Sequence, residues 1–431
     1  MQLSSFAISI AIANIALVSA DASNYWKAFT SQIDPKNITV PSIPATTSLN
    51  PTTECTYYNP DESLIVINAT EWPSIWDVAT SNNMDTSPEF LALYDSLDWA
   101  NAPNISVRKL TSDGGLDFTG YDSSADPDCW WSASVCVHPK LADVSADIIN
   151  CPEPETWGLT YDDGPNCSHN AFYDYLQEKK LTASMFYIGS NVLDWPYGAM
   201  RGVLDGHHIA SHTWSHHYTT TLTNKEVLAE FYYTQKAIKL ATGLTPRYWR
   251  PPYGDIDDRV RWIATQLGLT AVIWNLDTDD WAAGVTTTIE AVKQTYDDYV
   301  EMGTNGTFAT SGNIVLTHEI NNNTMDLAID YLPKILSAYK QVIDVATCYN
   351  ISYPYFEDIE WTNVLNASTA AAAASSVASS SVAASGSSSA SAAAGTVTAA
   401  GAQINQSATS GASQLLPSAL FTLVLAAVAL L

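Results

Sequence analysis

Short apolar runs that are followed at once by polar side chains recur along the middle of this 431-residue chain. Asp162 and Asp163 follow one such run, His212 and His216 follow another, and His318 follows a third. The runs predict strands, and the helical patterns between them indicate a mostly parallel sheet. Polar residues at successive strand ends are how a parallel α/β barrel builds an active site. About seven strand and helix units fit, so we predict an α/β fold, a distorted (β/α)7-type barrel.

The predicted strands are short and rich in β-branched and aromatic residues, at 156–161, 183–188, 208–211, 247–249, 271–276, 314–317 and 342–348. The predicted helices of this region cover residues 168–180, 257–267, 288–302 and 325–340, and a capping box at 223–226 opens a further long helix that ends before Gly243. An N-terminal extension, residues 21–150, has weak periodicity, with short helices expected at 71–80 and 87–99.

Both ends of the chain resemble targeting segments of a secreted protein. Residues 1–20 have the apolar run and small-residue end of a signal peptide. Residues 366–414 consist almost entirely of Ala, Ser, Thr, Gly and Val, which predicts a disordered stalk. The apolar residues 415–431 then predict a removable glycosylphosphatidylinositol (GPI) attachment signal, with Ser407 or Ser410 as the attachment site, and a tail anchor is the alternative.

Charge and cysteine content restrict the partners and the compartment. A formal net charge of -27 argues against nucleic acid and anionic membranes as partners, and is compatible with a neutral or cationic polymer. Six cysteines in an oxidising compartment predict three disulfides, and our preferred pair is Cys151 with Cys348, which bracket the predicted barrel. Sequons predict surface glycans at Asn37, Asn68, Asn104, Asn166, Asn305, Asn322, Asn350, Asn366 and Asn405.

His212 and His216 suggest a metal site. On a helical turn, residues four positions apart project from one face, so both imidazoles can bind one ion. Asp163 would add a carboxylate oxygen. Such a ligand set leaves positions open for water and substrate, as a catalytic ion needs, and suits zinc or cobalt. Two surface histidines are the alternative for an isolated pair of this spacing.

Asp162 is the candidate general base, because adjacent side chains in extended chain point to opposite sides and Asp163 is the expected ligand. Arg250 would hold Asp162 by paired hydrogen bonds, and the backbone N–H of Tyr253 would face a developing oxyanion. An Asp-Asp-Gly turn and a structural proline turn are the alternatives for these two segments.

His318 is the candidate general acid, and Asp280 would orient it and raise its pKa. Leu316 faces the same side as His318 and would line a pocket for a methyl group, while Trp281 would wall a sugar site. Taken singly, a core histidine and a packed tryptophan are the alternatives. Their joint occurrence in strand order favours a catalytic site.

Five segments together resemble the motifs of the polysaccharide deacetylase (NodB-homology) family: Thr160-Tyr161-Asp162-Asp163-Gly164, His212-Thr213-Trp214-Ser215-His216, Arg250-Pro251-Pro252-Tyr253-Gly254, Asp277-Thr278-Asp279-Asp280-Trp281 and Leu316-Thr317-His318. The resemblance covers residues 151–356 as a catalytic domain, and the full chain resembles the chitin deacetylases of mucoralean fungi. It implies a distorted barrel and metal-dependent removal of acetate from N-acetylglucosamine units of chitin. It also implies the roles given above, with Asp162 and Tyr253 beside the bound acetyl group.

Two other functions stay open. The same motifs fit a deacetylase of another polysaccharide, such as xylan or peptidoglycan. A non-catalytic, wall-anchored protein that binds glycans through its 14 Trp and 22 Tyr residues is the alternative from a different class. In each case we expect a secreted protein at the outer face of the plasma membrane or in the cell wall, with a lipid anchor as its membrane attachment. The sequence leaves the oligomeric state open.

Overall fold

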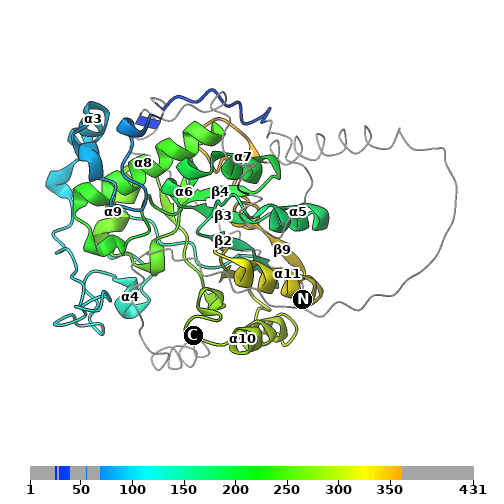
Figure 1. Ribbon diagram of the computed structural model, residues 1–431. Helices are drawn as coiled ribbons and strands as arrows, with labels where there is room; N and C mark the ends of the chain where they lie inside the picture. Colours follow the sequence, from blue (N-terminus) through cyan, green and yellow to red (C-terminus); the bar gives the residue numbers. More distant parts are fainter. Residues whose placement is uncertain (1–24, 27–28, 39–54, 56–67, 362–431) are drawn as a thin grey trace, which may run out of the picture.

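The computed structural model describes residues 25–26, 29–38, 55 and 68–361. The predicted signal peptide, stalk and GPI signal, with Ser407, Ser410, Asn366 and Asn405, lie outside these residues. Parallel strands lie at the centre of the described part, and helices lie around them (Figure 1). None of the helices in this part combines the length and apolar character needed to cross a membrane.

The strands form two parallel sheets. The first has the order β2-β3-β4-β5-β6, with bounds Thr160–Asp162, Ser184–Tyr187, His208–Ser211, Tyr248–Trp249 and Thr270–Ala271. The second has the order β7-β8-β1-β9, with bounds Leu276–Asp277, Asn313–Leu316, Thr156–Gly158 and Gln341–Ile343.

The two sheets are joined into one ring at two places, because β1 and β2 are consecutive parts of one stretch and so are β6 and β7. Leu159 joins β1 and β2, donating its N–H to the carbonyl of Ile343 and accepting from the N–H of Ser184, so the neighbour on this edge changes from β9 to β3. On the other edge, a parallel bridge between Asp162 and His318 continues the ladder beyond β8. The predicted distorted barrel is confirmed, and its first predicted strand is two elements.

Two other predicted strands also differ from the structure. The strand at 271–276 is divided into β6 and β7, because Val272 between them pairs with Ile148 of the N-terminal extension. The predicted strand at 342–348 extends too far, because β9 ends at Ile343. Asp344 caps a short helix, α12 (Val345–Cys348), by accepting the N–H of Thr347 at 2.9 Å.

The predicted helices of the barrel are present as α5 (Asn170–Lys179), α8 (Asn224–Thr242), α9 (Asp258–Gln266), α10 (Ile289–Met302) and α11 (Asn322–Ala338). Thr223 and Glu226 form the capping box of α8, and Gly243 ends it in the left-handed conformation with φ 76°. Two helices that the sequence analysis missed, α6 (Gly189–Asp194) and α7 (Pro196–Leu204), are too short to give a clear helical period.

The described part of the N-terminal extension is mostly irregular, with η1 (Ala69–Glu71), η2 (Ser81–Thr86), α3 (Pro88–Ser96), η3 (Trp99–Asn101) and α4 (Trp131–Ser134). The helix predicted at 71–80 is wrong, since Trp72 is extended, as the residue before a proline favours. The helix predicted at 87–99 is present as α3, which begins after the N-cap Ser87 and lies against α8 (Figure 1).

A small apolar cluster fills the ring. Phe186, Ala210 and Ile314 come from three strands and are fully buried in it, whereas their neighbours Met185 and Ile209 pack in the larger cluster with the helices. This alternation is expected of strands that are covered on both faces. All six cysteines are paired, as Cys55–Cys167, Cys129–Cys136 and Cys151–Cys348. The last disulfide, which is the pair preferred from the sequence, belongs to the cluster inside the ring.

Candidate active site

Asp163, His212 and His216 come together at the carboxyl ends of the strands. Oδ1 of Asp163 lies 3.4 Å from Nε2 of His212 and 3.2 Å from Nε2 of His216. One ligand atom from each residue lies within 4.8 Å of the others. Burial opposes ionisation of Asp163, but positive charge on His216 and His212 outweighs it when these imidazoles are protonated, and the pKa of Asp163 then lies well below its usual value.

The donor set of these residues fits a divalent cation. Nδ1 of His212 lies 2.8 Å from the carbonyl oxygen of Arg250, which can only accept, so Nδ1 carries the proton and Nε2 presents a lone pair. That lone pair faces Oδ1 of Asp163, a buried oxygen to which no hydrogen bond is made among the described residues. Acceptors that face one another in this way are stabilised by a cation between them.

The loop that carries both histidines is not helical, so the predicted helical turn is wrong. Thr213 and His216 have φ of 63° and 58°, and this left-handed backbone turns both imidazoles toward Asp163. Glu230 of α8 supports the loop: Oε2 accepts the N–H groups of Trp214 and Ser215, each at 2.8 Å.

Glu230 also ties this loop to the N-terminal extension, because its Oε1 accepts the N–H of Ala79 at 2.9 Å. Glu230 was not predicted from the sequence. The sequence does contain one indication of its role. Glu230 lies between the apolar residues Ala229 and Phe231, and a charge buried there would destabilise the fold unless it had a partner. His217 does not join the cluster, since its Nδ1 lies 2.8 Å from the hydroxyl of Ser215.

Asp162 and Arg250 form a buried ion pair inside the ring. Nη1 of Arg250 lies 2.6 Å from Oδ1 of Asp162 and also donates to the hydroxyl of Thr160 at 2.9 Å. The predicted paired hydrogen bonds are therefore wrong: Arg250 gives Asp162 one, and its Nε donates to the carbonyl of Val272. Oδ2 of Asp162 stays without an arginine partner, 3.7 Å from Nε2 of His212.

His318 lies beside this pair, as the backbone bridge to Asp162 requires. Its Nδ1 is 2.6 Å from Oδ1 of Asp280, and its backbone N–H donates to Oδ2 at 2.9 Å. Burial lowers the pKa of His318, but the charge and hydrogen bond of Asp280, aided by Asp163 and Asp162, raise the pKa to about 10.

Three further predicted residues surround these groups. Tyr253 is half exposed, has φ 58°, and stacks on Tyr218 at a centroid distance of 4.2 Å. Its ring lies 4.7 Å from that of His216. Leu316 is buried at the end of β8, whereas Trp281 is 47% exposed. An exposed tryptophan at this edge is available for contact with a ligand.

A buried pair beside Gly164 was also not predicted from the sequence. Oε2 of Glu319 lies 2.7 Å from Nδ1 of His169, and Oε1 accepts the hydroxyl of Tyr173 at 3.0 Å. A Cβ on Gly164 would lie 1.9 Å from Oε1 of Glu319, so only glycine allows this approach. The glycine of the Asp-Asp-Gly segment is the signal that could have indicated a close neighbour.

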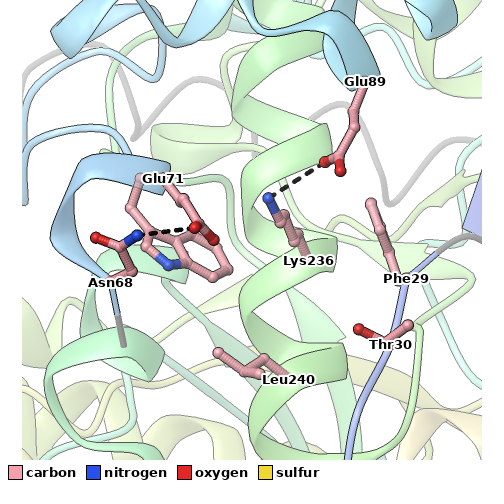
Figure 2. Close-up of a pocket in the computed structure, with 8 residues that line it drawn as sticks. Phe29, Thr30, Asn68, Glu71, Glu89, Lys236 and Leu240 are labelled. Atoms are coloured by element: carbon pink, nitrogen blue, oxygen red, sulfur yellow. Dashed lines mark hydrogen bonds and ion pairs between the residues drawn. The ribbon is translucent and has the colours of Figure 1, made fainter. Parts of the chain in front are cut away.

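The pocket of Figure 2 lies elsewhere, between the N-terminal extension and α8, and none of the residues above lines it. Its lining residues are Phe29, Thr30, Asn68, Glu71, Trp72, Glu89, Lys236 and Leu240. Trp72 is 4% exposed, and Lys236 turns toward Glu89 (Figure 2). The pocket therefore belongs to a different part of the fold from the metal-type cluster.

Comparison with known proteins agrees with the motifs. The family model described as polysaccharide deacetylase matches residues 149–272. A chitin deacetylase of Amylomyces rouxii is 74% identical over 373 residues, which are 86% of this chain and 88% of that protein. Chitin deacetylase 2 of Cryptococcus neoformans var. grubii is 48% identical over 323 residues, 73% of this chain and 69% of that protein.

Among solved structures, the chitin deacetylase of Colletotrichum lindemuthianum matches 49% of this chain and 96% of its own, with 24% identity and a TM-score of 0.45. The resemblance expected from the five motifs is confirmed by the high identity to the Amylomyces protein over most of both chains. The chain belongs to the polysaccharide deacetylase family.

Proposed function

We propose that the protein hydrolyses the N-acetyl groups of N-acetylglucosamine units in chitin and releases acetate and chitosan. The observation that carries the proposal is the cluster of one carboxylate oxygen and two imidazole nitrogens within 4.8 Å, with a second carboxylate and a third imidazole beside it. The names of the relatives from Amylomyces and Cryptococcus support chitin as the substrate.

Asp163, His212 and His216 would hold one divalent ion, zinc or cobalt. When bound, such an ion polarises a carbonyl and lowers the pKa of water from ~15.7 to ~7. Asp162 then acts as the general base, because its Oδ2 is not engaged by Arg250 and faces the cluster.

The remaining residues complete an amide hydrolysis. The attacking water gives its proton to Asp162 as its oxygen bonds to the acetyl carbon. The Tyr253 N–H stabilises the developing oxyanion. Nε2 of His318 donates a proton to the leaving nitrogen as the C–N bond breaks, while Asp280 holds Nδ1. Leu316 lines the pocket for the acetyl methyl group, and Trp281 supports the sugar ring.

The two ends of the sequence and the disulfides support a site of action outside the cell. Three disulfides indicate an oxidising compartment outside the cytosol. The apolar end at 415–431 and small residues near Ser407 and Ser410 support a GPI anchor at the outer face of the plasma membrane or in the wall. Release from protoplasts, which lack the wall, by a phosphatidylinositol-specific phospholipase C tests the anchor, and a protein that stays bound to the protoplast membrane contradicts it.

Acetate release from a panel of polymers tests the activity. We expect release from chitin oligomers, its loss with a chelator, and its recovery when zinc or cobalt is added back. Faster release of acetate from acetylxylan or peptidoglycan would show that this polymer, and not chitin, is the preferred substrate. Binding of the intact protein to chitin without acetate release would contradict an enzyme and favour a glycan-binding protein.

A further inference from the structure

We infer that Asp255 and the N-terminal extension together position the active-site loops, with Trp130 of the extension as the key hydrogen-bond donor. The inference rests on the proposed function, because it concerns the loop that carries Tyr253. Asp255 follows Tyr253 by two residues and is completely buried, yet none of the steps above uses its carboxylate.

The Asp255 carboxylate is saturated by donors from two directions. Its Oδ1 accepts Nε1 of Trp130 and the hydroxyl of Ser132, each at 2.8 Å. Its Oδ2 accepts the N–H and the hydroxyl of Thr220, also at 2.8 Å. A buried carboxylate is costly unless its oxygens are hydrogen-bonded, so each of these four contacts helps to keep Asp255 in place. Asp255 therefore ties the extension to the segment that follows the histidine loop.

Asp255 is hydrogen-bonded to both neighbouring loops of the active site. Thr220 lies in η4 (Thr219–Thr221), shortly after His216, and the hydroxyl of Thr219 donates to the backbone carbonyl of Asp255. The N–H of Asp255 donates to the carbonyl of Pro252 at 2.9 Å and closes the turn that contains Tyr253. A displacement of Asp255 would move this turn directly.

Trp131 supports the same turn from the extension. A Cβ on Gly254 would lie 2.4 Å from the Trp131 ring, so the ring is pressed against the backbone there. The ring meets Trp274 edge to face at 5.1 Å, and Trp274 lies 5.6 Å from the guanidinium of Arg250. The extension therefore contacts the segment from Arg250 to Asp255 directly at Gly254 and Asp255, and it reaches Arg250 only through Trp274.

This support matters because of the backbone at Tyr253. A non-glycine residue with φ 58° is unfavourable and persists only where the surrounding structure holds it. Its N–H direction is the property that an oxyanion donor needs, and a donor for the transition state affects kcat more than KM. The extension thus acts as a positioning element for the reaction.

Trp130→Phe tests the inference because it removes one donor to Asp255 and keeps an aromatic ring. The matched control is Trp26→Phe, since Trp26 is also a buried tryptophan of the extension, and its Nε1 donates to the carbonyl of Leu267 at 3.0 Å. We expect Trp130→Phe to lower kcat on chitin oligomers about 10-fold with KM within about 2-fold. We expect Trp26→Phe to keep the wild-type kcat.

Ser132→Ala is the second test, because it removes another donor to the same oxygen and keeps the rest of the buried surface. Ser132→Ala should also lower kcat, and it keeps the inference testable if Trp130→Phe does not fold. Unchanged kcat in both variants, or an equal loss in Trp26→Phe, would overturn the inference and leave the proposed function intact. A wild-type protein that releases no acetate would instead overturn the proposed function and this inference with it.

Discussion

Asp280 holds His318 by two contacts, one from Nδ1 of the imidazole at 2.6 Å and one from the backbone N–H at 2.9 Å. The two contacts fix both the orientation of the ring and the nitrogen that carries the shared proton. Asp280 does not engage Nε2, and the charges of Asp163 and Asp162 also favour the protonated ring. A general acid for a leaving amine needs this arrangement.

Asp280→Asn should therefore shift the alkaline limb of the kcat–pH profile to lower pH. The general acid must be protonated, so activity falls as pH rises through the pKa of His318, and that pKa drops when the carboxylate is lost. Because the pKa of His318 is higher in the folded protein than in the unfolded chain, its protonation also stabilises the fold. This contribution is complete below pH ~6.5 and is lost as the pH rises through about 10. Asp279→Asn, at the exposed neighbour, is the control; an unmoved limb in Asp280→Asn contradicts the assignment.

Asp162→Asn should lower kcat by at least ~10²-fold and leave the metal content unchanged. The asparagine keeps an oxygen that can accept from Nη1 of Arg250, so the buried arginine retains a partner. It cannot take a proton from water. Acetate release and elemental analysis on the same preparation check the two parts, and full activity rules out Asp162 as the base.

His216→Ala should lose the bound ion, whereas His217→Ala should keep it. The two histidines are adjacent, but Nε2 of His216 faces Asp163 and Nδ1 of His217 lies beside the hydroxyl of Ser215. Metal content after dialysis, measured by elemental analysis, separates them. An equal loss of metal in both variants would mean that the substitutions disturb the loop, and that His216 is not a specific ligand.

Removal of the Cys151–Cys348 disulfide should destabilise the fold more than removal of Cys129–Cys136. The first joins residues 197 positions apart and the second residues 7 apart. In the chain-entropy model this difference in loop length corresponds to about 3 kcal/mol in the free energy of unfolding. Paired Cys→Ser variants and thermal unfolding provide the comparison. An equal decrease in Tm would show that loop length does not control the effect.

The sequence predicted the barrel well because each strand is short, apolar and followed by a polar segment. It could not predict how the ring closes, since Leu159 pairs with Ile343 and Ser184, which lie far away along the chain. The same non-local pairing, at Val272 with Ile148, divided another predicted strand. Register of this kind is decided by tertiary contacts, which local patterns do not contain.

The cluster of candidate ligands was predictable as a set of residues, but its geometry was not. The spacing of His212 and His216 suggested a helical turn, whereas left-handed φ at Thr213 and His216 brings the imidazoles together. That backbone depends on the Glu230 carboxylate from another element. The supporting role of Asp255 escaped for the same reason, because its donors come from distant parts of the chain.

Glu230 has one more consequence. Its two oxygens accept N–H groups from Ala79, Trp214 and Ser215, so the histidine loop has a support that involves none of the three candidate ligands. We therefore expect a chelator to strip an ion from Asp163, His212 and His216 without unfolding the loop. Activity lost in this way should return with either zinc or cobalt, and no refolding step should be needed.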